Sequence, residues 1–151
     1  MDEALQSFEK AIEHDPDDFE SPLLSTAAYY MRGDKDAAIR VAKIGVERAE
    51  RILEDYPDTP RAYYLGAAGL FVLDRIDLAI EWAERALEIA PDDAATRYNS
   101  ACFFVKLDDT ERALDCLENS VMSRTWIEND PDLEPLHGHP RFHAIVDALP
   151  D

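Results

Sequence analysis

Three histidines near the C-terminus are the first candidates for chemistry, because imidazole nitrogens bind zinc and nickel. His139 and His143 are four residues apart, which would place both side chains on one face of a helix, and His137 precedes them. Pro140 interrupts that spacing at the expected start of a helix, and no cysteine is near in the sequence. We therefore expect structural histidines, with adventitious metal binding as the alternative, and predict no metal site and no cofactor.

The two cysteines and the many acidic residues are the other reactive side chains. Cys102 and Cys116 lie 14 residues apart on adjacent predicted helices, and we expect buried free thiols there; a redox pair or a metal site is the alternative. Carboxylate pairs are unavoidable among 33 acidic residues, so no such pair indicates catalysis by itself. The sequence contains no phosphate-binding loop, dinucleotide-binding glycine pattern or nucleophile elbow, and we predict that the protein is not an enzyme.

Composition and charge narrow the class of partner. The 151 residues include 33 acidic and 15 basic side chains, and the net charge of −18 disfavours nucleic acid and anionic membrane surfaces, which bind clustered Lys and Arg. No apolar run approaches the roughly 18 residues of a membrane helix. Asp2 and Glu3 follow Met1, which is the wrong charge for a signal peptide. We predict a cytoplasmic protein whose partners are proteins or peptides, not nucleic acid or membrane.

An internal repeat supplies the elements that would position any site. The segments 2–16 (DEALQSFEKAIEHDP) and 77–91 (DLAIEWAERALEIAP) align along their length. The matching alanines of four segments are Ala4, Ala38, Ala79 and Ala113, which are 34, 41 and 34 residues apart. The seven extra residues of the middle interval make nearly two helical turns, so they keep the buried face in register. The sequence therefore predicts one unbroken helix over residues 35–55.

Prolines and aspartates mark the ends of the other helices. Pro16 and Pro91 follow helix ends, whereas Asp93 and Asp109 precede helix starts, where a carboxylate binds free N–H groups. The predicted helices cover residues 2–14, 20–32, 35–55, 60–73, 76–89, 93–107, 110–122 and 141–149. Four basic side chains lie off the apolar stripe of the long helix: Arg40, Lys43, Arg48 and Arg51. We interpret them as a solvated face, with a docking patch for an acidic partner as the alternative.

The repeat resembles the tetratricopeptide repeat over about 120 residues of the chain. The small, large and proline residues typical of that family appear in the third repeat as Ala67, Leu70, Ala79, Ala86 and Pro91. The resemblance implies an all-α fold, an antiparallel helix-turn-helix solenoid of about three and a half repeats with a C-terminal capping helix. It predicts a repeat domain over residues 1–125 and a capping segment over residues 126–151.

The same resemblance implies a binding groove, because the first helices of the repeats line the concave face in this family. The groove residues predicted on this basis are Tyr30, Arg61, Tyr64, Phe71, Tyr98 and Lys106. Aromatic and arginine side chains are typical of binding hot spots. The alternative is that the aromatic side chains only pack between repeats.

The chain begins inside a repeat, since residues 1–16 correspond to a second helix without a first. Leu5, Phe8 and Ile12 share one helical face that their own repeat cannot cover completely. We predict that this face stays partly exposed and is an assembly face, in contact with a second copy of the chain or with an upstream domain. Fraying of the terminal helix is the alternative. We expect the chain to be the C-terminal piece of a longer protein.

The C-terminal segment carries a second, shorter resemblance. Asp130-Pro131-Asp132-Leu133 and His139-Pro140-Arg141-Phe142 are similar to the tail of repeat regions in bacterial signalling proteins, including adenylate and guanylate cyclase fusions. Two function classes follow from the two resemblances. One is a non-catalytic protein–protein interaction module, as a regulatory or scaffolding part of a larger bacterial signalling protein. The other is a self-association module that makes a homodimer of such a protein, for example the C-terminal region of an adenylate cyclase.

Overall fold

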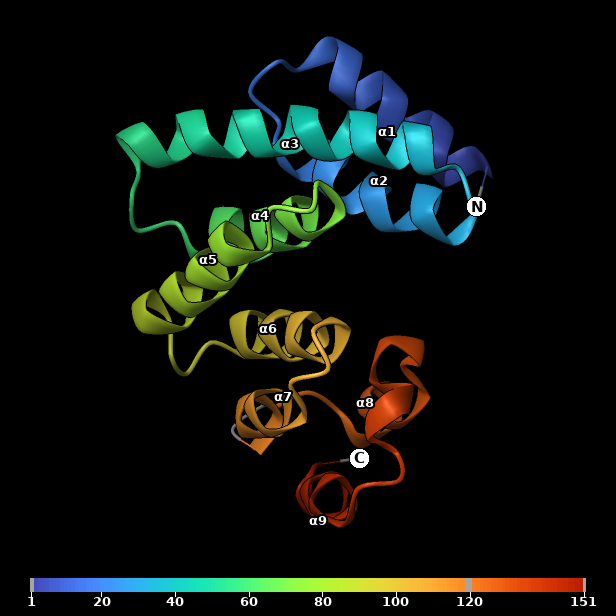
Figure 1. Ribbon diagram of the computed structural model, residues 1–151, viewed down its shortest axis with the longest axis vertical. Coiled ribbons are helices and arrows are strands. Elements are labelled where there is room, and N and C mark those ends of the chain that lie inside the picture. The colour runs from blue at the N-terminus through green and yellow to red at the C-terminus, as the bar shows by residue number, and fades with distance from the viewer. Residues whose placement is uncertain (1, 119–120, 151) are drawn as a thin grey trace. The chain divides into compact units, whose positions relative to one another are not determined.

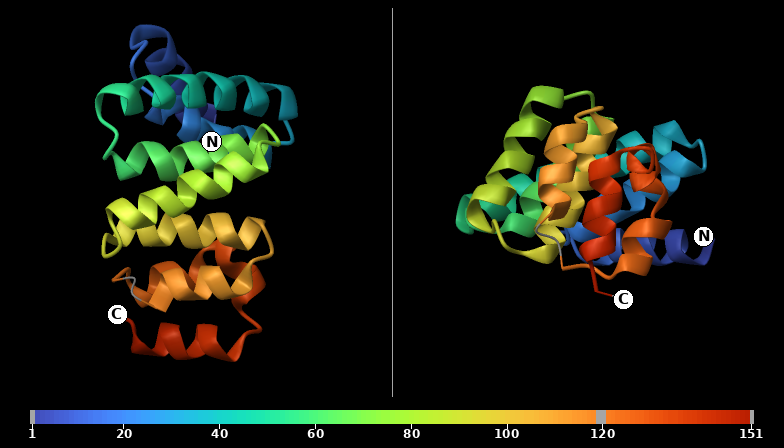
Figure 2. Two further views of the ribbon diagram at one scale, coloured as in Figure 1. Left: turned by 60° about the vertical axis from the view of Figure 1, so that its left-hand side comes forward. Right: turned by 90° about the horizontal axis from the view of Figure 1, so that it is seen from below.

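The computed structural model describes residues 2–118 and 121–150, and its regular structure within those ranges is entirely helical. The predicted all-α class, with antiparallel helix pairs, is confirmed (Figures 1 and 2). The chain forms two compact units, Met1–Ile89 (unit 1) and Ala90–Asp151 (unit 2). The domain boundary predicted after residue 125 concerns the extent of the repeats and stays a prediction.

Unit 1 is a half repeat followed by two complete helix pairs. Its described residues form α1 (Asp2–His14), α2 (Glu20–Met31), α3 (Lys35–Asp55), α4 (Pro60–Val72) and α5 (Ile76–Ile89). α2 pairs with α3 and α4 with α5, while α1 packs on α2, and α4 packs on both α2 and α3. α3 spans 21 residues without a break, as predicted from the seven-residue insertion, and Figure 1 shows it extending beyond α2.

Glycines allow the helices of unit 1 to approach closely. Leu23 of α2 fits against two of them: a Cβ atom built on Gly45 or Gly69 would lie 2.5 or 2.6 Å from the Leu23 side chain. Trp82 of α5 covers a third, because a Cβ on Gly66 would lie 2.2 Å from its Cζ3 atom. Real Cβ atoms do not approach so closely, so a larger residue at any of these positions would displace the Leu23 or Trp82 side chain.

Arginines of α3 hold α1 in place. The Arg48 guanidinium donates hydrogen bonds of 2.8–2.9 Å to the backbone carbonyl oxygens of Ile12, Asp15 and Asp18. Arg51 donates to the carbonyl of Pro16 at 2.9 Å, and Arg40 pairs with Glu9 at 2.5 Å. The carbonyl of Ile12 lies in the last turn of α1, where carbonyls have no partner within the helix, and the other three belong to the loop that follows. The arginines satisfy all four. The face interpreted as solvated therefore contributes three of its four basic side chains to contacts inside unit 1.

Unit 2 contains the last helix pair and a C-terminal segment folded back on it. Its described residues form α6 (Ala94–Lys106), α7 (Thr110–Glu118), α8 (Arg124–Asn129), the 3-10 helix η1 (Pro131–Leu136) and α9 (Pro140–Ala148). η1 packs on α6, α9 packs on α7, and α8 contacts both η1 and α9. The capping helix is α9, close to the predicted bounds, whereas α8 and η1 were not predicted.

The helix predicted over residues 110–122 is too long at its C-terminal end. Residues 121 and 122 are not helical, while 119 and 120 lie outside the described residues. Residues 121–123 lead into α8, whose first turn is capped by the hydroxyl of Ser123, which accepts from the N–H of Trp126. Capping by Asp93 and Asp109 is as predicted: each carboxylate accepts an N–H three residues further on.

Side chains clamp α9 at both of its ends. Arg141, in its first turn, donates to three carboxylates of α7: those of Glu111 (3.0 Å), Asp115 (2.5 Å) and Glu118 (2.8 Å). These acids are four and three residues apart and therefore share one helical face. At the other end, Arg124 donates from Nη2 to the carbonyl of Asp147 at 3.0 Å, and its backbone N–H donates to the carbonyl of Pro150 at 2.8 Å.

One turn conformation recurs after α2, α4 and α6 and gives the repeat its regularity. The residues at this turn have positive φ: Gly33 (77°), Asp74 (59°) and Asp108 (56°). The following N–H donates to the carbonyl five residues earlier: Asp34 to Tyr29, Arg75 to Leu70 and Asp109 to Phe104, at 2.9–3.0 Å. This hydrogen bond defines the Schellman motif that ends many helices. Glycine occupies it once and aspartate twice, although the left-handed region favours glycine.

Candidate functional site

Large apolar side chains are exposed along one side of α2 in unit 1. Leu24 is 42% exposed, Tyr30 55% and Met31 69%, and Ala27 is also exposed. We call these four residues the α2 stripe. They are exposed because α2 buries its other side, with Leu23, Ser25 and Thr26, against its neighbours in the unit. Tyr30, predicted as a groove residue, is thus accessible to a partner.

The predicted groove residues of α4 are more enclosed. Arg61 donates from Nη2 to Glu20 of α2 at 2.7 Å and from Nη1 to the Tyr64 hydroxyl oxygen at 2.9 Å. Tyr64 is 5% exposed, and Phe71 is half-buried. The structure therefore brings Arg61 and Tyr64 together and links them to α2, with Tyr64 packed inside the unit. Their role in partner binding stays a prediction.

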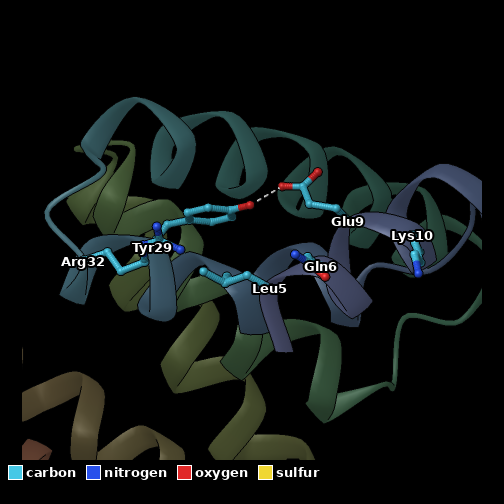
Figure 3. A pocket seen from close by; sticks show the side chains of 6 residues that line it. All are labelled: Leu5, Gln6, Glu9, Lys10, Tyr29 and Arg32. Atoms are coloured by element: carbon cyan, nitrogen blue, oxygen red, sulfur yellow. Dashed lines mark hydrogen bonds between the residues drawn. The ribbon is translucent and has the colours of Figure 1, made fainter. Parts of the chain in front are cut away.

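A cavity of about 470 Å³ lies between α1 and the end of α2 (Figure 3). Its lining residues are Leu5, Gln6, Glu9, Lys10, Tyr29 and Arg32. Glu9 Oε1 accepts hydrogen bonds of 2.5 Å from the Tyr29 hydroxyl and from Arg40. Burial raises the pKa of the Glu9 carboxyl, but the hydrogen bonds from Arg40 and Tyr29 outweigh it, so this pKa lies below its usual value. The carboxylate stays ionised at neutral pH and joins three helices.

The exposure predicted for the assembly face on α1 is wrong for two of its three residues. Leu5 is 3% exposed and Ile12 7%, and Phe8 is half-buried. α1 packs on α2, and Arg48 and Arg51 of α3 fix its C-terminal end, so the missing first helix leaves less of this face open than the sequence predicts. The predicted assembly role is a separate matter and stays a prediction.

In unit 2, the following segment of the chain covers the groove residues of α6. The Tyr98 hydroxyl donates to Asp130 Oδ2, and the Tyr98 ring meets Trp126 edge to face with centroids 6.3 Å apart. Lys106 Nζ lies 3.5 Å from the carboxylate of Asp132. Burial, followed by the hydrogen bond to Asp130, raises the pKa of the Tyr98 phenol. Both predicted groove residues of unit 2 are therefore engaged by residues 124–136.

Apolar side chains anchor this covering segment. The fully buried anchors, each at most 1% exposed, are Ile127, Leu133 and Leu136. Asp130 also accepts the N–H of Asp132 and thereby begins η1. Sequence reasoning missed the contact of Trp126, Asp130 and Asp132 with α6. The only local signal was the spacing of Leu133 and Leu136, which are three residues apart, as one face of a short helix requires.

The histidines and cysteines have structural surroundings. His139 caps α9, where its Nδ1 accepts the N–H of Arg141 at 3.2 Å. His137 stacks on Phe142 with centroids 5.1 Å apart, and His143 meets the same ring edge-on. Within the described ranges, no group of three or more His, Cys, Asp or Glu side chains is arranged to hold a metal ion.

Cys102 and Cys116 are free and buried, as predicted. Burial raises the pKa of Cys102 to about 12 and that of Cys116 to about 11, so both thiols stay protonated at neutral pH. A protonated thiol is a poor nucleophile and a poor metal ligand. The two cysteines therefore act as small apolar side chains in the core of unit 2.

Comparison with known proteins matches one segment of the chain to a repeat family. Residues 72–93 match the tetratricopeptide repeat. The crystal structure of MamA is similar over 95% of this chain and 80% of that chain, with 17% sequence identity and a TM-score of 0.47. No curated protein gave a match. In the part of the chain that the structure describes, no helix has the length and hydropathy needed to cross a membrane. Residues 72–93 are thus similar to the tetratricopeptide repeat, and they lie within a fold of antiparallel helix pairs.

Proposed function

We propose that this protein is a non-catalytic protein–protein interaction module and that the α2 stripe of unit 1 is its partner-binding surface. The observation that carries the proposal is the exposure of Leu24, Tyr30 and Met31 on one helix, by 42, 55 and 69%. Contiguous exposed apolar side chains commonly mark interaction sites. The tetratricopeptide repeat matched at residues 72–93 supports the same class of function, because such repeats generally serve protein binding.

The hydrogen bond between Arg61 and Glu20 extends this surface from α2 toward α4. Both side chains are exposed by about 40% or more, so a partner in contact with the stripe could also reach them. Tyr64 would support Arg61 from below through its hydroxyl and would not contact the partner directly. In this proposal, the predicted groove reduces to the α2 stripe with Arg61 at its edge.

The experiment compares two exposed tyrosines of unit 1. Tyr30→Ala removes a stripe residue, whereas Tyr56→Ala removes a side chain that is 65% exposed beyond the end of α3. Proteins retained by the immobilised wild-type chain are identified by mass spectrometry, and the affinity of the best-enriched partner is then measured. We expect Tyr30→Ala to weaken that partner by about fivefold or more, the usual effect of an interface aromatic, and Tyr56→Ala to leave it unchanged. Equal affinities for all three chains would refute the stripe as the binding surface.

A regulatory or scaffolding role in a bacterial signalling protein, or within an adenylate cyclase, rests on the tail resemblance alone and stays a prediction. The alternative function, self-association into a homodimer, is tested by the same variants. If the partner of the stripe is a second copy, sedimentation would show a wild-type dimer that Tyr30→Ala converts to a monomer. Cytoplasmic location likewise stays a prediction from the sequence.

A further inference from the structure

A second cavity of unit 1 combines aromatic rings with carboxylates. It measures about 370 Å³ and is lined by Tyr63, Glu81, Trp82, Glu84, Arg85 and Glu88. All of these lie on α4 or α5, which pack together as a pair (Figure 1). The cavity is separate from the α2 stripe and shares no residue with it.

Close helix packing fixes the aromatic part of this cavity. The benzene ring of Trp82 lies directly over Gly66, where a Cβ would be 2.2 Å from Cζ3. Tyr63 meets Trp82 edge to face, with an angle of 82° and centroids 5.5 Å apart. Both rings are therefore held in position before any ligand binds. Rigid aromatic rings attract cations through the negative potential of their faces.

The rim of the cavity is strongly acidic. Glu81, Glu84 and Glu88 recur at three- and four-residue spacing on α5 and are all exposed. Arg85 is the one cation among the lining residues, and its guanidinium lies 3.1 Å from Glu88 and 3.6 Å from Asp58. Two carboxylates thus lie within 4 Å of the guanidinium, and those of Glu81 and Glu84 add negative charge to the same rim. Because Arg85 is itself 45% exposed, these ion pairs are well solvated and a competing cation can exchange into them.

Trp82 also brings a hydrogen-bond donor to the cavity. Its side chain is 8% exposed and is one of the residues that line the cavity. An indole N–H can only donate a hydrogen bond, so a carbonyl oxygen is its complementary group in a ligand. A peptide supplies both complementary groups at once: a cationic side chain for the carboxylates and a backbone carbonyl for the indole.

We propose that this cavity binds an arginine or lysine side chain from a basic segment of a partner protein. The cation would lie against the Tyr63 and Trp82 rings and between the carboxylates of α5. The carbonyl of the same residue, or of its neighbour, would accept the Trp82 N–H. The net charge of −18 favours the approach of a basic segment over long range.

Trp82 fluorescence provides the readout, because the chain has only two tryptophans and Trp126→Phe leaves Trp82 as the single emitter. The Trp126→Phe chain is titrated with acetylated tetra-arginine amide, tetra-lysine amide and neutral tetra-glutamine amide at about 20 mM salt, where screening is weak. We expect a saturable change in Trp82 emission with both cationic peptides and none with the neutral peptide. Absence of a saturable change with either cationic peptide would overturn the proposal.

Two triple variants separate a local site from general attraction to an acidic protein. Glu81→Gln/Glu84→Gln/Glu88→Gln neutralises the rim, and Glu13→Gln/Glu47→Gln/Glu54→Gln makes the same change of net charge at exposed acids elsewhere in unit 1. We expect the rim variant to weaken binding by about tenfold or more and the matched variant by about twofold or less, because close charges dominate over screened distant ones. Circular dichroism confirms that both remain folded. Equal weakening by the two variants would refute the cavity as the site.

Discussion

Equivalent helices of the two units, α2 and α6, differ in how far other parts of the chain cover them. α2 begins the first complete pair of unit 1 and leaves Leu24, Tyr30 and Met31 exposed. α6 begins the pair of unit 2, and there Tyr98 and Lys106 are engaged by Asp130 and Asp132 of the same chain. The difference shows that a repeat alone does not determine whether its first helix is open to a partner. The segment that follows the pair decides whether this helix is exposed, because residues 124–136 fold back onto α6.

The outer helices differ in how arginines hold them. Arg48 binds backbone carbonyls at the end of α1, whereas Arg141 binds the side-chain carboxylates of α7. A carbonyl has no titratable proton near neutral pH, but a carboxylate loses its charge in acid. The attachment of α9 should therefore depend on pH and salt more strongly than that of α1.

The largest expected effect is on stability, and it distinguishes the covered face of α6 from the exposed α2 stripe. Leu136, the last residue of η1, is 1% exposed, so Leu136→Ala should destabilise unit 2 by about 2–5 kcal/mol, the usual range for a buried leucine. Met31→Ala, on the open stripe, should change stability by no more than about 0.5 kcal/mol. Urea unfolding followed by circular dichroism measures both. Similar free energies of unfolding for the two variants would show that the covering segment is not part of the folded core.

A second prediction concerns the carboxylates that hold α9. The hydrogen bond from Arg141 lowers the pKa of Glu118 below its usual value. A lowered folded-state pKa contributes stability above the unfolded-state pKa, and this contribution is lost as the pH falls through the folded-state value. In Arg141→Gln, the pKa of Glu118 should rise toward that of a free glutamate, measured by NMR titration of the side-chain carboxyl. The pKa of Glu9, held by Arg40 in unit 1, serves as the control and should not move.

The smallest expected change in stability concerns the recurring positive-φ turn, which is compared between the two units. Asp74 and Asp108 adopt positive φ, which glycine tolerates better, and Gly33 already occupies the matching turn. Asp74→Gly in unit 1 and Asp108→Gly in unit 2 should each raise stability by about 0.5 kcal/mol, with relief of strain partly offset by the entropy of glycine. Thermal unfolding measures the change. A loss of stability in both variants would mean that the aspartates contribute more to the turn than their backbone strain costs.

Local patterns predicted most helices well because their signals are local. Prolines after α1, α3 and α5, and carboxylates before α6 and α7, mark boundaries within one or two residues of those observed. The seven-residue insertion was correctly placed within one helix because its small residues keep the helical spacing. The sequence did not predict α8 and η1, because a six-residue helix is too short to show the helical spacing of apolar residues. In η1, Pro131 and Pro135 also argue against a helix.

The candidate site was less predictable from local patterns. Tyr30 and Tyr64 have the same residue type on corresponding helices, yet one is 55% exposed and the other 5%. Which tyrosine is accessible depends on what packs beside each helix, and such contacts leave no periodic signal in either helix. For the same reason, the sequence predicted too much exposure for Leu5 and Ile12.

The sequence by itself determined the all-α class, the recurring pairs and the unbroken α3, because helical periodicity and capping act over a few residues. Only the tertiary structure decided which faces are covered. Arg48 reaches from α3 to carbonyls thirty or more residues earlier in the chain, and Asp130 meets Tyr98 across a separation of 32 residues. Such long-range contacts depend on how the chain folds back, which local propensity does not encode.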